Sequence, residues 1–177
     1  MKKKPKKSLL IVYTGNGKGK TTAALGTCMR AMGQGMKVCV LQFLKCNKKT
    51  GEAVFAKSVR PCMRFLVEGR GFTWMSKDIG KDVEKARRAW QKAKKIIFSG
   101  EFDLVVLDEL TYLLRYKIIS AREISETLQK RPGHVNVIIT GRHAPDTLIR
   151  MADVVTVMQE KKHPFRKKIP ALRGIDY

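Results

Sequence analysis

The chain has 177 residues, of which 44% are hydrophobic, and its 37 lysines and arginines against 15 acidic residues give a formal net charge of +22. This length allows one well-buried domain and excludes two domains of ordinary size. No apolar run approaches the roughly 20 residues that cross a bilayer, so we expect a soluble protein without a membrane partner. The cationic residues are spread along the chain without strong aromatic interleaving, which favours a solvated basic surface over a nucleic-acid site.

The chain opens with a lysine-rich stretch, residues 1–7, which we predict to be a disordered tail on a single domain formed by residues 8–177. The apolar residues that follow the tail end at Gly15 and include Thr14, so they form a poor export signal and a good buried strand. The domain is therefore expected to begin with this strand.

The four cysteines indicate the redox compartment. They form no Cys-x-x-Cys pair and have no nearby histidine at metal-ligand spacing, which is typical of reduced thiols in a cytoplasm. Cys28 and Cys39 fall within a predicted helix and a predicted strand, so we expect both to be small core residues. The sequence leaves the positions of Cys46 and Cys62 open.

Alternating apolar runs and helical periods predict an α/β fold with a mainly parallel sheet and helices on both faces, because parallel strands need crossover helices. The five runs predicted to be strands are Leu9 to Tyr13, Val38 to Phe43, Leu104 to Leu107, Val135 to Thr140 and Val154 to Met158. Right-handed crossovers would place the loops that follow the strands along one edge of the sheet, where open α/β folds bind ligands.

Two helices between the strands are predicted from their sequence patterns. Ser120 and Glu123 match a capping box, so a helix should begin at Ala121 and end near Arg131. An earlier helix is predicted from apolar residues that recur three and four positions apart: Val83, Ala86, Trp90, Ala93 and Ile97. We expect Trp90, on that apolar face, to be a core residue rather than a ligand-binding residue.

The stretch from Leu44 to Lys81 shows no sustained helical or strand periodicity and is long for a simple connection. Long irregular segments inside compact domains are often binding loops or lids. We predict such a role for the part that contains Phe72 and Trp74. The alternative is that the two rings only cover the edge of the core.

A glycine-rich loop follows the first predicted strand and predicts nucleotide binding. Its residues are Gly15, Asn16, Gly17, Lys18, Gly19, Lys20, Thr21 and Thr22. Backbone N–H groups in such a loop, with the dipole of the helix that follows, bind phosphate oxygens, while Lys20 supplies a charge and Thr21 holds Mg²⁺. The loop has three residues between Gly15 and Gly19 where four are usual. An ordinary glycine-rich turn is the alternative, but strand, loop and helix stand in the order that the motif requires.

The apolar run Leu104 to Leu107 ends in two carboxylates, Asp108 and Glu109. A carboxylate at this edge of the sheet can bind the Mg²⁺ of a bound nucleotide, and we predict that role for Glu109, with Asp108 as a second candidate. The alternative is that the pair stabilises the start of the next helix. The pair does not identify the reaction, because hydrolysis, phosphoryl transfer and attack elsewhere on the nucleotide all need neutralised phosphate charge.

Several short motifs occur in order along nearly the whole chain. They are Thr14 to Ala24, Gln42-Phe43, Gly71 to Trp74, Leu107 to Tyr112, Arg131-Pro132, Thr140 to Arg142, Ala152-Asp153, Lys162 to Phe165 and Gly174 to Tyr177. Each motif is weak alone, but together they resemble the phosphate-loop type of ATP:corrinoid adenosyltransferase. The resemblance implies a homodimeric enzyme with a RecA-like phosphate-loop fold, which transfers the 5′-deoxyadenosyl group of ATP to the cobalt of reduced cobalamin or cobinamide and releases triphosphate.

The resemblance also implies roles for particular residues. The triphosphate would be held by Asn16, Gly17, Gly19, Lys20, Thr21 and Thr22. Thr21 and Glu109 would bind Mg²⁺, and Arg30 would assist at the nucleotide. Phe72 and Trp74 match aromatic residues that pack under the corrin and displace the lower axial ligand of cobalt, so that reduced flavin or flavodoxin can deliver the last electron.

The chain departs from the family pattern near both ends, because the lysine tail stands where a longer segment is usual and Leu172 stands where glutamine is usual. Arg166-Lys167-Lys168 also replaces a stretch that often contains glycine.

Two rival functions are also compatible with the sequence. One is a phosphate-loop ATPase that acts on nucleic acid, suggested by the +22 charge and by Asp108-Glu109. The other is a noncatalytic carrier of a nucleotide or a corrinoid.

Overall fold

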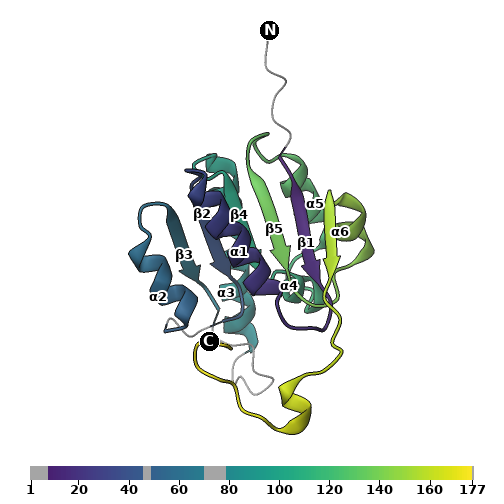
Figure 1. The fold of residues 1–177 in the computed structure, drawn as a ribbon. Coiled ribbons are helices and arrows are strands. Elements are labelled where there is room, and N and C mark those ends of the chain that lie inside the picture. The colour runs from purple at the N-terminus through teal and green to yellow at the C-terminus, as the bar shows by residue number, and fades with distance from the viewer. Residues whose placement is uncertain (1–7, 46–48, 70–78, 177) are drawn as a thin grey trace.

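The computed structural model describes residues 8–45, 49–69 and 79–176 (Figure 1). Within these residues six parallel strands form one sheet, in the order β3-β2-β4-β5-β1-β6. The strands are β1 (Leu10–Thr14), β2 (Val38–Gln42), β3 (Met63–Val67), β4 (Leu104–Asp108), β5 (Asn136–Thr140) and β6 (Val154–Val157). The helices are α1 (Lys20–Gly33), α2 (Gly51–Ser58), α3 (Ile79–Ser99), α4 (Thr111–Arg115), α5 (Ala121–Gln129), α6 (Asp146–Met151) and the short 3-10 helix η1 (Pro164–Lys167). None of these helices is long and apolar enough to cross a membrane.

Helices cover both faces of the sheet (Figure 1), and each face has its own apolar cluster. On one face, Cys28 of α1 and Ala56 of α2 share a buried cluster with Val106 of β4. On the other face, α3, α5 and α6 contribute to a cluster that contains Val105 of β4. Neighbouring residues of β4 thus point to opposite faces, as the period of a strand requires. The α/β phosphate-loop fold predicted from the sequence is confirmed.

The five predicted strands are confirmed, whereas the prediction for Leu44 to Lys81 is wrong in part. This stretch contains α2 and a sixth strand, β3, which lies at the edge of the sheet. β3 has an exposed Arg64 beside a buried Met63 and three half-buried residues, so it lacks the continuous apolar run of a central strand. α2 has eight residues, too few to show a clear helical period.

The helix predictions for α3 and α5 are confirmed in their main features. α5 begins at Ala121, and the Ser120 hydroxyl accepts a hydrogen bond from the backbone N–H of Glu123 at 3.0 Å. The Glu123 carboxylate accepts hydrogen bonds from Trp90 Nε1 at 2.7 Å and from Lys94 Nζ at 2.9 Å, and so links α5 to α3. Trp90 is completely buried, which confirms its predicted place in the core.

Two cysteines occupy the core as predicted. Cys28 and Cys39 are completely buried, and burial raises the pKa of both thiols to about 12. Cys62 is exposed, while Cys46 lies outside the described residues. The two core thiols therefore stay protonated and unreactive near neutral pH.

Candidate functional site

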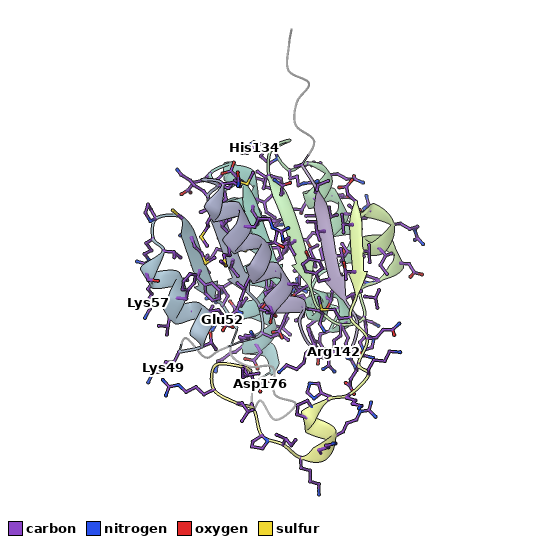
Figure 2. The ribbon with its side chains drawn as sticks, viewed as in Figure 1. Lys49, Glu52, Lys57, His134, Arg142 and Asp176 are labelled. Atoms are coloured by element: carbon purple, nitrogen blue, oxygen red, sulfur yellow. The ribbon has the colours of Figure 1, made fainter. Side chains whose placement is uncertain are left out.

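The carboxyl ends of the strands surround a cavity of about 510 Å³, at the edge of the sheet predicted from the sequence. The glycine-rich loop between β1 and α1 forms one wall, and residues that follow β2, β4 and β5 form others. Figure 2 shows Glu52 and Arg142 at this end of the sheet and His134 at the opposite end. The topology thus brings the predicted loop and the predicted carboxylates to one place.

The glycines of the loop are required by its backbone and by the chain that packs against it. Gly15 and Gly19 have φ values of 96° and 108°, in the left-handed region that favours glycine. A Cβ on Gly17 would lie 2.6 Å from the carbonyl oxygen of Gln159, and the Gly17 N–H donates to the Met158 carbonyl at 2.7 Å. The loop is therefore packed against the chain just after β6.

Lys20 is the first residue of α1, and its side chain folds back on the loop. Its ammonium group donates to the carbonyl oxygens of Gly15 and Gly17, both at 2.7 Å. Burial lowers the pKa of Lys20, as does Arg142, while Glu109 acts in the opposite direction. In this position the ammonium group can exchange carbonyl oxygens for the oxygens of a phosphate.

Asp108 ends β4 and is completely buried. Its Oδ1 accepts hydrogen bonds from Thr21 Oγ1 at 2.9 Å and from Thr140 Oγ1 at 2.6 Å. Its Oδ2 accepts a hydrogen bond from Gln42 Nε2 at 2.9 Å. One carboxylate therefore joins the start of α1 to the ends of β2 and β5. Because Thr21 gives its proton to Asp108, the lone pairs of the Thr21 oxygen remain available to a cation.

Glu109 lines the cavity beside the loop. Its φ of 64° is unusual for a residue with a side chain, and its N–H donates to Thr140 Oγ1 at 2.9 Å. Burial and the neighbouring charge of Asp108 raise the pKa of Glu109 to about 7. A divalent cation nearby would favour the ionised carboxylate.

The arrangement of Thr21 and Glu109 fits Mg²⁺ in the presence of a nucleotide. Mg²⁺ commonly binds proteins through one or two carboxylates and completes its octahedron with water and substrate phosphates. Across the described segments, no group of three or more histidine, cysteine or acidic side chains could hold a metal ion. Phosphate oxygens and water would therefore have to complete the coordination.

Lys45 and Glu52 also line the cavity, although the sequence did not identify either as a site residue. Lys45 Nζ donates to Glu52 Oε1 at 3.0 Å. Burial alone would lower the pKa of Lys45, but Asp108 and Glu52 together raise it above its usual value. Lys45 follows β2 closely, so its place at the carboxyl edge could have been predicted. Glu52 lies in α2, which the sequence pattern did not reveal.

Arg142 is a third charged residue that the site prediction omitted, and it lines the cavity from the turn after β5. The turn depends on Gly141, which has a φ of 146° and where a Cβ would lie 2.0 Å from Thr111 Oγ1. Thr111 Oγ1 also donates to the Arg142 carbonyl at 2.7 Å. Thr140 to Arg142 stood out as a sequence motif, but the motif alone did not reveal its place beside the loop.

The remaining predicted site residues differ in where they lie. The structure brings Asn16, Gly17, Lys18, Gly19, Lys20, Thr21, Thr22 and Glu109 to the cavity. Gly15 instead lines a neighbouring cavity of about 480 Å³. Arg30 is in the last turn of α1, about 15 Å along the helix axis from Lys20, so it does not reach the cavity. Phe72 and Trp74 lie outside the described residues.

A glycine-rich loop between a strand and a helix, a lysine that folds back on it and a threonine bonded to a strand-end aspartate together define a phosphate-loop nucleotide-binding protein. The profile of one protein family, described as ATP:corrinoid adenosyltransferase BtuR/CobO/CobP, matches residues 6–177. The chain therefore belongs to the ATP:corrinoid adenosyltransferase family.

Curated relatives match along nearly the whole chain. It is 41% identical over 177 residues to a corrinoid adenosyltransferase of Sinorhizobium sp, covering 99% of this chain and 83% of that protein. It is 40% identical over 171 residues to the corrinoid adenosyltransferase of Escherichia coli (strain K12), covering 97% and 86%. The corrinoid adenosyltransferase CobA of Salmonella typhimurium (strain LT2) matches with the same identity and coverage. The chain is accordingly a transferase.

Proposed function

We propose that the cavity binds ATP with its triphosphate on the loop Gly15 to Thr22 and presents the 5′-carbon to a reduced corrinoid. Adenosylation of a corrinoid with ATP is the activity of the family to which the chain belongs. The observation that carries this placement is the hydrogen bond from Thr21 to Asp108. This hydrogen bond orients the Thr21 hydroxyl, which can bind a cation. The next residue in the chain, Lys20, has an ammonium group that can bind phosphate.

The proposed reaction is a direct displacement in which the substrate cobalt is the nucleophile. The Co(I) centre of reduced cobalamin or cobinamide supplies both electrons of the new bond to C5′ while the C5′–O bond breaks, and the electron pair of that C–O bond leaves with triphosphate. No proton is transferred in this step, so the protein supplies no general base. Its part is to orient ATP and to neutralise the leaving group, for which Lys20, Lys45 and Arg142 line the cavity.

Mg²⁺ would be held by Thr21 and Glu109 together with triphosphate oxygens. Bound there, the ion would neutralise negative charge on the leaving group. The oxygens of Asp108 already accept hydrogen bonds from Thr21, Thr140 and Gln42. We therefore propose that Asp108 orients the Thr21 hydroxyl and does not contact the ion directly.

The corrin side of the site rests on the family resemblance. Phe72 and Trp74 are proposed to pack under the corrin and displace the lower axial ligand, after which a reduced flavin or flavodoxin reduces the cobalt. A homodimer and a cytoplasmic location are proposed on the same ground. Arg30 is exposed and far along α1 from the loop, which gives no support to a contact with the nucleotide of its own protomer.

The proposal is tested by incubating the protein anaerobically with ATP, Mg²⁺ and chemically reduced cobalamin while the visible spectrum is followed. A light-sensitive alkylcobalamin should form. A phosphate-loop ATPase that acts on nucleic acid would instead release phosphate, and this release would be stimulated by nucleic acid and suppressed by salt. A noncatalytic carrier would bind both ligands and convert neither. Folded protein that binds ATP but forms no alkylcobalamin would overturn the proposed function.

A further inference from the structure

The end of the chain forms part of the cavity wall. After β6 the chain runs past the carboxyl edge of the sheet and turns back toward the side on which α2 lies (Figure 1). Gly174, Ile175 and Asp176 line the cavity together with the loop residue Lys18. Figure 2 shows Asp176 at the same edge as Glu52 and Arg142. A segment remote in sequence from the phosphate loop is thus part of the nucleotide cavity.

An ion pair ties this segment to the loop. Lys18 Nζ donates to Asp176 Oδ1, across 158 positions of sequence. Asp176 Oδ2 accepts a hydrogen bond from the Leu172 N–H at 2.8 Å, and the Asp176 N–H donates to the Leu172 carbonyl at 2.8 Å. In the described part of the chain, the other hydrogen bonds of residues 172–176 are internal to this turn. The Lys18 contact therefore attaches a self-contained turn to the loop.

The turn is attached weakly. The Lys18 side chain is 45% exposed and that of Asp176 is 23% exposed, and ion pairs so accessible to water contribute little. Leu172 and Ile175 are 53% and 75% exposed, so the turn also buries little apolar surface. A ligand that competes for Lys18 can therefore detach the turn at small cost.

The triphosphate of ATP is such a competitor. Phosphate oxygens bind an ammonium group through the same charge-assisted hydrogen bonds as a carboxylate, and a triphosphate carries several charges where Asp176 carries one. The Asp176 carboxylate and a triphosphate on the loop would also repel each other across the cavity. Lys18 therefore binds the triphosphate more strongly than it binds the Asp176 carboxylate.

We propose that Asp176 competes with ATP for Lys18. Asp176 binds Lys18 in the nucleotide-free enzyme, and this ion pair breaks when the triphosphate binds. Exchange of Lys18 from the carboxylate to the phosphate detaches residues 172–176 from the loop. ATP binding and release of this turn are thus coupled. The inference rests on the proposed function in one respect, which is that ATP binds on the loop.

The affinity for Mg·ATP, measured by calorimetry, tests the competition. Asp176→Asn should tighten binding about two- to fivefold, the range that an exposed ion pair supports. Glu126→Gln removes the same charge from an exposed ion pair with Arg122 outside the cavity and should leave the affinity unchanged. In a Lys18→Met background, Asp176→Asn should have no further effect. If the wild type binds ATP and Asp176→Asn binds it equally well or more weakly, the proposed competition is overturned while the proposed function is not.

Limited trypsin digestion tests the release of the turn. Cleavage after Arg173 should be faster with Mg·ATP than without it, and Asp176→Asn should be cleaved rapidly in the absence of any nucleotide. Protection of Arg173 by ATP would mean that the turn closes over the nucleotide, which contradicts the inference. The digestion of Asp176→Asn without nucleotide does not depend on ATP binding. If wild type binds no ATP, the proposed function fails together with the exchange, so the two failures are distinguishable.

Discussion

Thr21 Oγ1 lies 2.9 Å from Asp108 Oδ1 and donates a hydrogen bond to it, which joins the start of α1 to the end of β4. The strand between β1 and β4 is β5, and its last residue, Thr140, donates to the same oxygen. The phosphate loop, the proposed cation ligand and the carboxyl edge of the sheet are thus fixed relative to one another by a buried carboxylate. Such preorganisation lets the site receive a charged substrate with little rearrangement.

Asp108→Asn should weaken Mg²⁺-dependent ATP binding about 10- to 100-fold, a typical cost of losing a group that orients a metal ligand. An amide presents only one acceptor oxygen, so it cannot receive the donors that now converge on both oxygens. ATP titrations at several Mg²⁺ concentrations measure the loss. Asp103→Asn is the matched control, because Asp103 lies before β4 and its carboxylate accepts a hydrogen bond from the backbone N–H of Lys37 at 2.9 Å. An unchanged Mg²⁺ dependence in Asp108→Asn would contradict the role assigned to it.

Gly17→Ala should abolish detectable ATP binding, because the added Cβ would lie 2.6 Å from a backbone oxygen and must displace the loop. The control is Gly26→Ala in the interior of α1, where a Cβ would meet no atom within 4 Å. That substitution should keep ATP binding and stabilise the fold by about 0.5–1 kcal/mol. ATP titration and thermal unfolding of both variants give the comparison. Wild-type ATP affinity in Gly17→Ala would show that the loop geometry is not needed.

Glu123→Ala should destabilise the domain by about 1–3 kcal/mol, because it leaves the buried Trp90 N–H without its acceptor. Urea denaturation measures the change in unfolding free energy. Glu123→Gln keeps an oxygen for Trp90 and should recover part of the loss, whereas Glu126→Ala, at an exposed pair with Arg122, should have no measurable effect. Equal stability of Glu123→Ala and wild type would show that the link between α3 and α5 contributes nothing.

The Glu123 carboxylate should also give stability a pH dependence. Burial opposes its ionised form, but hydrogen bonds from Lys94 and Trp90 outweigh burial and lower the pKa of Glu123 below the ordinary value of 4.5. A lowered pKa stabilises the fold at pH values above the ordinary value, and this contribution disappears as the pH falls through the lowered one. The stability difference between wild type and Glu123→Gln should therefore shrink in acid. A difference that grows as the pH falls would contradict this sign.

The core thiols should be protected in the folded protein. With the pKa of Cys28 and Cys39 raised to about 12 by burial, a variant that carries Cys46→Ser and Cys62→Ser should react slowly with a thiol reagent until it is unfolded. The unfolded chain releases thiol protons above its ordinary pKa of 9.0, so stability should also fall as the pH rises past that value. Rapid labelling of the native variant would place at least one of these cysteines outside the core.

Sequence patterns were sufficient for the parts of the fold with strong local signals. The buried strands β1, β2, β4 and β5 are nearly continuous apolar runs, and the Ser120 cap marks the start of α5. β3 was not predicted because Arg64 interrupts its apolar residues and only Met63 is buried, so it shows no such run. The helix α2 was not predicted because its eight residues are too few to show a clear helical period.

The phosphate site was predictable where it is local in sequence. The loop and Glu109 follow strands directly, so the parallel topology alone places them together. Lys45 follows β2 closely and was predictable on the same ground, whereas Glu52 and Asp176 join the cavity through tertiary structure that no spacing in the sequence reveals. Asp108 is buried and accepts hydrogen bonds from three other elements, and neither feature can be read from the sequence. Asp108 was for this reason predicted as a candidate metal ligand.

In the proposed reaction, ATP is cleaved between C5′ and the triphosphate as the cobalt–carbon bond forms. The most direct test is to quantify the phosphate products in the anaerobic reaction with cob(I)alamin alongside the alkylcobalamin. One intact triphosphate is expected for each alkylcobalamin formed. Orthophosphate or diphosphate as the primary product, formed whether or not the corrinoid is present, would show that the enzyme does not displace triphosphate from C5′.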